Sequence, residues 1–445
     1  MSSQNQTEHK RVLIVSHNAL SRTANNGKTL TALFADWPRD KLAQFYLMHE
    51  MPDVSICGRF FRITDEEMLR ACLTRAPAQG SALDAPQDAG EAERAPQGTG
   101  MGRRLYRLVQ IALAHHLPLF EWARDRVWRP RLYRSPALCA WLDDFAPEVV
   151  FFQGSNYPFA YGLVDWVCRR YGARLLLQLT DDYTYVPYKL LPMAWVNHAR
   201  YMRGFTAALG RAEAVYAISP AMQAEYARRF GCANIQVAAN CVPVRDATPE
   251  QPPAAPLRLL YAGSVHTGRW RSLRRLGEQL AALRAQGLEA CLEVYTPGAI
   301  SPRQRRALTL APCLRYGGSL TPEALQQAMA QAHVLVMVEA FSRAARWVTR
   351  LSLSTKIPEY MAAGRCVLAF GPPDVSSIRY IQDRDAGVVV TDRRPEAMRA
   401  ALRKLFDAEE RARTVARASR VARENHRQEL VRDALYAQIQ RGVGE

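Results

Sequence analysis

Residues 354–374 read STKIPEYMAAGRCVLAFGPPD, and this stretch decides the fold expected for the second half of the chain. Pro358 fits the first turn of a helix, and Gly364 is a residue that commonly ends one. The run CVLAF that follows is apolar throughout, as in a strand covered on both faces, and Gly-Pro-Pro then turns the chain. The stretch therefore predicts a helix over 356–363 followed by a buried parallel strand.

The charged residues of this stretch stand where a strand-and-helix fold can bind anions. Lys356 and the backbone amides at the start of the helix can meet a diphosphate. Glu359 can accept hydrogen bonds from the two hydroxyls of a ribose, as an acidic residue does in other nucleotide-binding folds. In the alternative interpretation Glu359 only offsets the helix dipole. The residues alone leave both interpretations open.

The alternation of strand and helix extends through both halves of the chain. Helices are predicted between the apolar runs, for example over 272–287 and 321–332. Apolar strands separated by helices indicate parallel sheets covered on both faces. The predicted strands are RVLIVS (11–16), QFYLM (44–48), VVFFQG (149–154), ARLLLQLTDD (173–182), AVYAIS (214–219), IQVAAN (235–240), LRLLYAGS (257–264), ACLEVYTPG (290–298), CLRYGGS (313–319), HVLVMVEA (333–340), CVLAFGPP (366–373) and AGVVVTD (386–392).

Two doubly wound α/β domains are the organisation that this pattern predicts. They span 1–245 and 257–425, with a Pro-rich hinge at 246–256 and a C-terminal helix over 426–445. Residues 73–101 are rich in Ala, Pro, Gly, Gln and acids, and predict a flexible insertion. Ligands of open α/β sheets bind beyond the carboxyl ends of the strands, so two such domains facing each other would form a cleft.

Several motifs resemble those of the GT-B glycosyltransferases of the retaining family-4 type, the group 1 glycosyltransferases. STKIPEYMAAGRCVLA resembles the signature P-S-K-x-x-E-Y-x-A-A-G-x-P-V-x-A, with Cys366 at the usual Pro position. LRLLYAGSVHTGRW (257–270) resembles the opening strand and donor loop of the second domain. YGGSLTPEALQQAMAQAHVLVMVEA (316–340) resembles its glycine-containing turn, helix and strand.

The first domain carries a shorter part of the resemblance. YAISPAMQAEYARRFG (216–231) and IQVAANCV (235–242) resemble its last unit, with Cys241 where glycine is usual. The resemblance covers residues 211–390. It implies two Rossmann-like domains facing across a cleft, with C-terminal helices that return to the N-terminal domain.

The resemblance also implies roles for individual residues. Lys356 would contact the donor diphosphate and Glu359 the ribose. Gly263 and Ser264 would form the donor loop. The base of the nucleotide would lie against Tyr316 and Gly318.

Two charged positions depart from the family pattern. The donor loop of the family has Arg directly after Gly and Lys a few residues later. In this chain Ser264 stands in place of that Arg, and Arg269 or Arg271 would take the role of the Lys. The family's E-x7-E pair is incomplete, because Leu351 stands eight residues before Glu359. We expect Glu339, at the end of the preceding strand, to replace the missing acid as a catalytic residue beside Lys356.

Residues 19–30, ALSRTANNGKTL, also follow a predicted strand and precede a predicted helix. A P-loop reads G-x-x-x-x-G-K-[ST], but its first glycine would fall at Arg22. A plain turn at Asn26 and Gly27, with a solvated Lys28, is one account. In the family that the chain resembles, the loop after the first strand approaches the donor phosphates, and Asn26 and Gly27 fit that role better than a P-loop.

The stretch LLLQLTDDYTY (175–185) ends another predicted strand in two acids. The family often has His-Asp here, with the His near the reacting sugar; Thr180 replaces this His, so its role does not transfer. Asp181 is a candidate for binding an acceptor hydroxyl or the sugar. Capping of the loop and metal binding are the alternatives, although the D-x-D spacing of a metal site is missing. We expect no metal site.

Composition narrows the class of protein. The nine cysteines form no C-x-x-C pair, which favours a reduced, cytoplasmic compartment. No apolar run of about 18 residues occurs, and the polar N-terminus lacks the apolar region of a secretory signal. The net charge of +17 suits nucleic acid, anionic lipid or a phosphorylated substrate. Because no nucleic-acid-binding motif is present, we expect no nucleic-acid partner.

Residues 101–134 hold eight arginines against Glu121 and Asp125, a net charge of +6. A helical pair packed on the first domain is one interpretation. The other is an amphipathic face on anionic lipid, which would make the protein peripheral on the inner face of the cytoplasmic membrane. The apolar residues interleaved with these arginines are Leu105, Leu108, Ile111, Trp122 and Trp128.

The sequence thus favours a glycosyltransferase that moves a sugar from a nucleotide-diphosphate sugar to an acceptor hydroxyl, with no cofactor. The resemblance implies a retaining, hexosyltransferase-like enzyme. Lys356 with Arg269 or Arg271 could stabilise the charge of the leaving group, so we expect the reaction to need no metal. A saccharide or lipid-linked acceptor in cell-surface polysaccharide or glycolipid biosynthesis fits the basic segment. The alternatives are a P-loop-like NTPase or kinase, with Lys28 on phosphate and Asp181 on magnesium, and a non-catalytic scaffold.

Overall fold

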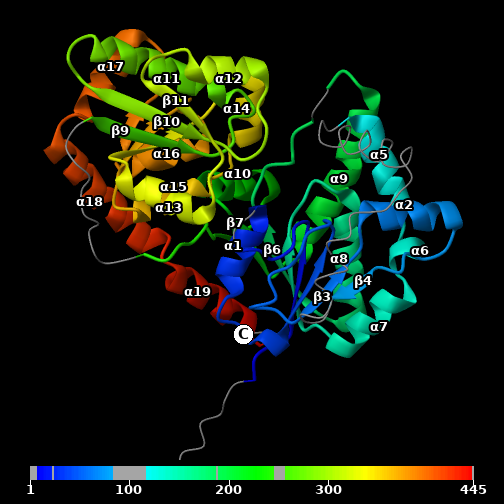
Figure 1. The fold of residues 1–445 in the computed structure, drawn as a ribbon. Coiled ribbons are helices and arrows are strands. Elements are labelled where there is room, and N and C mark those ends of the chain that lie inside the picture. Colours follow the sequence, from blue (N-terminus) through cyan, green and yellow to red (C-terminus); the bar gives the residue numbers. More distant parts are fainter. Residues whose placement is uncertain (1–7, 23–24, 84–116, 187–188, 245–255, 443–445) are drawn as a thin grey trace, which may run out of the picture. The chain divides into compact units, whose positions relative to one another are not determined.

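The computed structural model describes residues 8–22, 25–83, 117–186, 189–244 and 256–442. These residues divide into two compact units, each with its own sheet. Unit 1 comprises the described residues up to Ala238 together with those from Arg432 on. Unit 2 comprises those from Ala239 to Val431. Figure 1 shows the elements of both units, coloured along the chain.

The described part of unit 1 contains an eight-stranded sheet in the order β4-β3-β2-β1-β5-β6-β7-β8. Neighbouring strands run parallel, except for the antiparallel pair β3 and β4. Every residue of the central strands β1, β2 and β5 is buried, as the apolar runs predicted. The strands are β1 (Val12–Ser16), β2 (Leu42–Tyr46), β3 (Arg59–Arg62), β4 (Ser81–Leu83), β5 (Val149–Gln153), β6 (Arg174–Leu179), β7 (Ala214–Ala217) and β8 (Ile235–Val237).

Helices connect these strands, and several begin at a proline whose fixed φ suits the first turn. Helices α8 and α10 are followed by Gly172 and Gly231, whose positive φ suits the end of a helix. The helices are α1 (Asn25–Phe34), α2 (Asp65–Thr74), α5 (Pro118–Val127), α6 (Pro130–Tyr133), α7 (Pro136–Phe145), α8 (Pro158–Tyr171), α9 (Pro192–Arg211) and α10 (Pro220–Phe230), with a 3₁₀ turn over Arg39–Lys41.

Unit 2 contains a six-stranded, wholly parallel sheet in the order β11-β10-β9-β12-β13-β14 within the residues described. The predicted run CVLAF is β13, and the helix predicted at 356–363 is α15. The strands are β9 (Leu257–Ala262), β10 (Ala290–Tyr295), β11 (Leu314–Gly318), β12 (Val334–Val338), β13 (Cys366–Phe370) and β14 (Val388–Val390). The helices are α11 (Arg269–Arg284), α12 (Pro302–Thr309), α13 (Pro322–Gln331), α14 (Arg343–Thr349), α15 (Lys356–Ala362), α16 (Ser376–Asp383), α17 (Pro395–Lys404) and α18 (Ala408–Asn425). The last helix, α19 (Gln428–Gln440), begins in unit 2.

Both sheets wind outward from their first strand. Strand β1 lies between β2 and β5, and β9 lies between β10 and β12. The order of strands therefore reverses beside β1 in unit 1 and beside β9 in unit 2. Because ligands of doubly wound sheets bind at such reversal points, beyond the carboxyl ends of the strands, these ends carry the candidate site residues.

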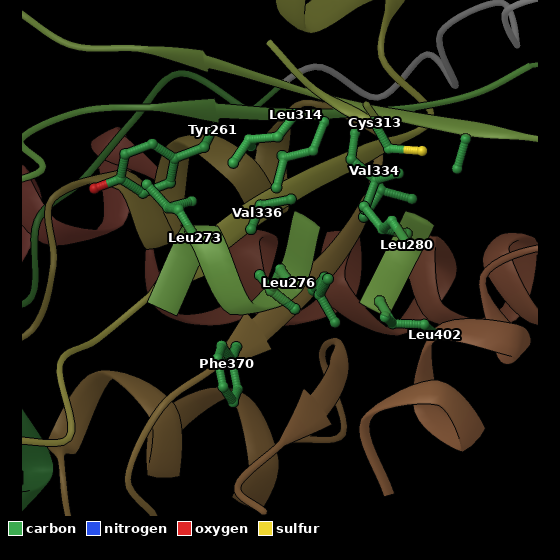
Figure 2. Packing of buried hydrophobic residues seen from close by; sticks show 14 of the residues in the cluster. Tyr261, Leu273, Leu276, Leu280, Cys313, Leu314, Val334, Val336, Phe370 and Leu402 are labelled. Carbon is green, nitrogen blue, oxygen red and sulfur yellow. The ribbon is translucent and has the colours of Figure 1, made fainter. Parts of the chain in front are cut away.

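The core of unit 2 is formed where α11 covers its sheet. Leu273, Leu276 and Leu280 recur at helical spacing and are fully buried against strand side chains such as Val336. Figure 2 shows these leucines beside Val336 and Tyr261. This packing fixes the start of α11, and the loop between β9 and α11 is therefore held at both ends.

A buried histidine closes unit 2 after α18. The His426 ring nitrogens lie 2.8 Å from the Tyr380 hydroxyl and 2.8 Å from the Asn240 carbonyl oxygen. Burial lowers the pKa of His426 to about 4, so the ring is neutral at ordinary pH. The two hydrogen bonds of this neutral ring thus join the residue after α18 to Asn240, near the start of unit 2, and to α16.

Helix α19 then leaves unit 2, and its residues from Arg432 on belong to unit 1. Arg432 Nε donates to the Ala32 carbonyl oxygen at 2.7 Å, and the Tyr436 ring packs 4.9 Å from that of Trp37. The C-terminal helix therefore returns to the N-terminal unit, as the resemblance implied.

The insertion predicted at 73–101 differs from the structure over its described part. Helix α2 continues to Thr74, and β4 at 81–83 pairs antiparallel with β3 through Phe61 and Ala82. Strand β3 was not predicted, because its two phenylalanines are flanked by arginines. The remainder of the insertion lies outside the described residues, as do Leu105, Leu108 and Ile111.

Trp128 does not lie on an outer amphipathic face, and the prediction that it faces lipid is wrong. Its side chain is 2% exposed and stacks 4.3 Å from the ring of Phe159. Its indole donates to Asp65 at 2.7 Å, and Arg124 donates to the same carboxylate at 2.8 Å. This end of the basic segment packs onto unit 1, as the first interpretation had it.

Truncation of the leucine at the centre of α11 tests the packing of unit 2. We expect Leu276→Ala to lower the free energy of unfolding of unit 2 by about 2–5 kcal/mol, because it removes buried methyl groups and leaves a cavity. Leu310→Ala, at a residue 59% exposed, should change it by less than about 0.5 kcal/mol. Urea unfolding followed by circular dichroism measures both; equal effects of the two variants would contradict the packing described.

Candidate active site

Gly263, directly after β9, allows the side chain of Lys356 to cross the backbone. Its φ is +151°, and a Cβ at this position would lie 1.8 Å from Lys356 Nζ. Any larger residue at 263 would therefore displace the lysine. The family-like donor loop and the lysine of α15, which are 93 positions apart, meet at this point.

The Lys356 ammonium lies against aromatic and apolar groups. Its Nζ is 4.4 Å from the centroid of the Tyr261 ring, and the Tyr261 hydroxyl donates to the Ser264 carbonyl oxygen at 2.6 Å. Burial and then the nearby Arg269 lower the pKa of Lys356 to about 7, while Glu339 and Glu359 act in the opposite direction. The lysine can therefore gain a proton when an anion arrives.

Glu339, directly after β12, forms a bidentate ion pair with Arg269. Arg269 Nε and Nη2 donate to the two carboxylate oxygens at 3.0–3.1 Å, and the Glu339 side chain is 3% exposed. Ser272 Oγ also donates to the Glu339 carbonyl oxygen at 2.8 Å. Burial raises the pKa of Glu339, and Arg269 opposes this shift.

The ion pair of Arg269 and Glu339 concerns two roles that were predicted from the sequence. Arg269 and Arg271 were alternatives for the basic residue of the donor loop. Arg269 is held by Glu339 in the cluster with Lys356, whereas the Arg271 guanidinium stacks 4.9 Å from the Trp270 ring on the exposed side of α11. Glu339 was expected to replace the family's sugar-contacting acid. In this structure its carboxylate positions Arg269.

Hydrogen bonds hold the ends of β9, β10 and β11 together. The Gly263 amide donates to the Tyr295 carbonyl oxygen at 2.8 Å, and the Thr296 amide donates to the Gly318 carbonyl oxygen at 2.8 Å. Beside Gly318, Tyr316 is half-buried and lies 5.1 Å from the Arg305 guanidinium. The residues expected to contact the base thus stand on the same sheet edge as Gly263.

Thr296 was not identified from the sequence. Its hydroxyl lies directly after β10 and is buried, with no hydrogen-bond partner among the described residues. The signal available was its position, since a small polar residue ends the predicted strand ACLEVY.

Glu359 lies in the first turn of α15 and is half-buried. Tyr360, the next residue, fixes this helix to the donor loop, because its hydroxyl donates to the Ala262 carbonyl oxygen at 3.3 Å. Unit 2 therefore brings Gly263, Ser264 and Lys356 together, with Glu359 on the same short helix as the lysine.

The acids at the end of β6 in unit 1 have different surroundings. Asp182 is buried and accepts hydrogen bonds from the Thr184 amide at 3.0 Å and the Tyr226 hydroxyl at 2.8 Å, which is a capping role. Asp181 is less buried, and the Thr180 and Tyr183 hydroxyls lie 3.4 Å from its carboxylate. Asp181 is therefore the more accessible of the two acids.

Asn26 and Gly27 lie in the first turn of α1 rather than in a loop, so the predicted loop was placed too far along the chain. Gly27 is buried, and a Cβ there would lie 2.0 Å from the Ala19 carbonyl oxygen. Close packing of α1 on the preceding backbone thus requires this glycine. Lys28, the next residue, is exposed.

His17, directly after β1, was missed although it follows the quoted strand RVLIVS. Its Nδ1 is buried without a hydrogen-bond partner in the part of the chain that the structure describes, and its ring lies 5.2 Å from that of Tyr157. Burial and then Arg124 lower the pKa of His17 to about 4, with Asp65 acting in the opposite direction. A neutral imidazole therefore stands at the point where the strand order of unit 1 reverses.

Residues 256–408 match the family described as Glycosyl transferases group 1, as the motifs predicted. No curated protein matches the chain in sequence. Among solved structures, α,α-trehalose 6-phosphate synthase from Burkholderia multivorans is similar with a TM-score of 0.59 at 12% identity, covering 97% of this chain and 98% of that one.

Two further structures contain nucleotides. The trehalose-6-phosphate protein of E. coli, bound with UDP-2-fluoro glucose, has a TM-score of 0.58 at 9% identity and covers 97% of this chain and 99% of its own. A point mutant of S. aureus TarM, in complex with fondaparinux, α-GlcNAc-glycerol and UDP, has a TM-score of 0.50 at 13% identity, covering 69% of this chain and 59% of its own. The fold is GT-B, as predicted.

The titration of Lys356 tests the geometry of this site. The chain has six lysines, so NMR of lysine Cε groups can resolve each of them. We expect one lysine to titrate near pH 7, because burial disfavours its charge, and this signal should be absent in Lys356→Met. A Lys356 signal that titrates near the ordinary lysine value of about 10.4 would contradict this account of the site.

Proposed function

We propose that this chain, a group 1 glycosyltransferase of GT-B fold, transfers a sugar from a UDP-type nucleotide sugar to an acceptor hydroxyl, using Lys356 and Arg269 in place of a metal ion. The observation that supports this most is the half-buried Lys356 side chain, which lies beside Gly263 and the Arg269–Glu339 pair. Breaking the bond between sugar and diphosphate releases negative charge, and fixed cations at that point stabilise the transition state.

Lys356 and Arg269 are the proposed contacts of the donor diphosphate. The Arg269–Glu339 pair is close to neutral as a unit, so Lys356 supplies the positive charge that attracts the anion. A lysine whose pKa is about 7 becomes fully charged when the diphosphate binds, which couples donor binding to proton uptake. UDP is the nucleotide proposed because the E. coli and S. aureus structures were solved with UDP-2-fluoro glucose and UDP.

Glu359 would accept hydrogen bonds from the ribose, and Tyr316 and Gly318 would contact the base. Ser264 and Gly263 would line the donor loop. The half-buried state of Glu359 and Tyr316 supports this assignment, because each combines fixed placement with remaining access.

Residues of unit 1 would bind the acceptor or the transferred sugar. Asp181 can accept from a hydroxyl, and the neutral His17 ring offers a second acceptor nitrogen at the carboxyl edge of the same sheet. In the same proposal, Asn26 and Gly27 at the start of α1 would approach the donor phosphates through their backbone. Glu339 would act through Arg269 rather than on the sugar itself.

The finer activity is part of the proposal. Hexosyl transfer with retention at the anomeric carbon follows from the family that the chain resembles. Acceptors in cell-surface polysaccharide or glycolipid synthesis, on the cytoplasmic side of the membrane, fit the basic segment 101–134. No helix of the described residues is long and apolar enough to cross a membrane.

Hydrolysis of nucleotide sugars by the purified protein tests the activity without knowledge of the acceptor. UDP-, GDP- and TDP-sugars are incubated with the protein in EDTA, and release of the nucleoside diphosphate is measured. We expect slow release from a UDP-sugar without added metal. Activity on ATP alone, dependent on magnesium and on Lys28, would support the NTPase alternative instead.

Glu359→Gln tests the donor contacts. A charge-assisted hydrogen bond contributes about 1.5–3 kcal/mol, so the variant should bind UDP at least roughly tenfold more weakly than the wild type. Its thermal unfolding should match that of the wild type. The matched control is Glu323→Gln, in the first turn of α13, which should leave UDP affinity unchanged. Unchanged UDP affinity in folded Glu359→Gln would leave Glu359 with only the helix-dipole role.

A further inference from the structure

The starts of α5 and α9 in unit 1 carry a concentration of exposed apolar side chains. Fifteen large hydrophobic residues of the described chain are exposed, and seven of them lie here. Leu190 is 97% exposed and Trp195 is 51% exposed, which water disfavours unless a partner covers them. The seven residues, which we name the α5/α9 surface, are Leu117, Leu119, Phe120, Leu190, Leu191, Trp195 and Val196.

The two groups of residues are neighbours in space. Helices α5 and α9 pack against each other, and Figure 1 shows them side by side. Asn197 Nδ2 donates to the Pro118 carbonyl oxygen at 2.7 Å, which ties the second turn of α9 to the first residue of α5. Trp195 Nε1 donates to the Lys189 carbonyl oxygen at 2.9 Å and holds the residues before α9 against its start. The exposed side chains therefore stand on a fixed scaffold.

Basic residues accompany this surface, and acids are almost absent from it. Residues 117–134 and 189–211 contain two acids, Glu121 and Asp125. Asp125 is buried and forms an ion pair with Arg200, so its charge is already neutralised. The exposed cations on the same segments are Arg126, Arg129, Arg131, Arg134, Lys189, Arg203 and Arg211, the last of which is paired with Asp165.

We propose that the α5/α9 surface binds anionic phospholipid bilayers. The apolar side chains enter the interface between headgroups and acyl chains, with Leu190 and Trp195 at the centre, while the arginines and Lys189 contact lipid phosphates. Trp is suited to this depth because its ring is apolar and its N–H is polar. This property goes beyond the transferase activity and does not depend on it.

The positive charge near the α5/α9 surface favours an anionic bilayer over a second copy of the chain as its partner. A symmetric dimer through this face would bring the same arginines of two copies together, and like charges at close range repel. An anionic bilayer offers both the apolar layer and the opposite charge. The sequence predicted a membrane-facing segment within residues 101–134. In the present proposal the membrane contact lies on the α5/α9 surface instead.

Vesicle flotation of the full chain tests the proposal. We expect binding to phosphatidylcholine vesicles that contain phosphatidylglycerol, and roughly tenfold weaker binding to phosphatidylcholine alone, because several cations face the surface. Binding should weaken at 1 M NaCl, where the Debye length is about 3 Å. Trp195 fluorescence should be quenched by brominated acyl chains, and this quenching should be lost in Trp195→Phe.

Paired variants separate the apolar and the charged contributions. Leu190→Glu with Trp195→Glu should weaken vesicle binding by about tenfold or more, since glutamates would enter the interface. The matched control is Leu310→Glu with Trp347→Glu, at residues of unit 2 that are 59% and 49% exposed. Arg126→Glu with Arg131→Glu should remove the preference for phosphatidylglycerol; Arg306→Glu with Arg420→Glu, also exposed, should not. Circular dichroism confirms that each variant is folded.

Three outcomes would overturn the proposal. In the first, the wild type does not float with anionic vesicles at low salt. In the second, the α5/α9 variants float as well as their unit 2 controls. In the third, the wild type binds no vesicles and is a dimer in sedimentation velocity, and Leu190→Glu with Trp195→Glu dissociates this dimer, which would mean that the surface joins two copies of the chain. Release of UDP from a donor sugar in solution is measured separately, and its presence or absence leaves this result unchanged.

Discussion

Burial of charge at the carboxyl ends of β9 and β12 is the constraint on which the proposed donor site depends. Glu339 is almost fully buried and is paired with Arg269, and Lys356 lies beside them over Gly263. Losing one partner of such a buried pair costs about 3–5 kcal/mol, so each charged group requires the others. Because Glu339 is engaged by Arg269, the proposed donor site relies on the charge of Lys356 to meet the diphosphate.

The apolar pattern predicted most of the fold because it repeats strongly. Strand β13 was expected at its observed residues, since CVLAF is apolar throughout and is bounded by glycine and proline turns. Strand β4 has three residues of mixed burial and gave no such signal. Helix α14 was missed because RAARWVT carries two arginines and no apolar stripe. Short or charged elements depend on tertiary contacts that a sequence pattern does not display.

The sequence predicted individual residues of the candidate site, but not which of these residues contact each other. Lys356 and Gly263 were both chosen from the sequence, yet only the structure shows that the lysine crosses that glycine. Arg269 and Glu339 were assigned separate tasks, because 70 positions lie between them and no spacing indicates an ion pair. His17 followed a predicted strand, but its significance depends on burial and on Tyr157, which comes from another part of the chain.

The solved structures of similar fold differ from this chain at about nine positions in ten, which shows how little of the fold depends on individual side chains. Apolar strands and glycine turns are sufficient to specify both sheets. Three candidate site residues, Ser264, Leu351 and Thr180, depart from the pattern of the family that the chain resembles. Selectivity for donor and acceptor should follow from these positions rather than from the fold.

Calorimetric titration of UDP in EDTA, into the wild type and Lys356→Met, tests the account most directly. The predicted result is metal-free binding by the wild type with uptake of a proton at about pH 8, seen as a dependence of the heat on the buffer. Lys356→Met, folded by circular dichroism, should bind about tenfold more weakly and without proton uptake. Binding that requires magnesium, or that is equal in the two proteins, would contradict a donor site built on Lys356.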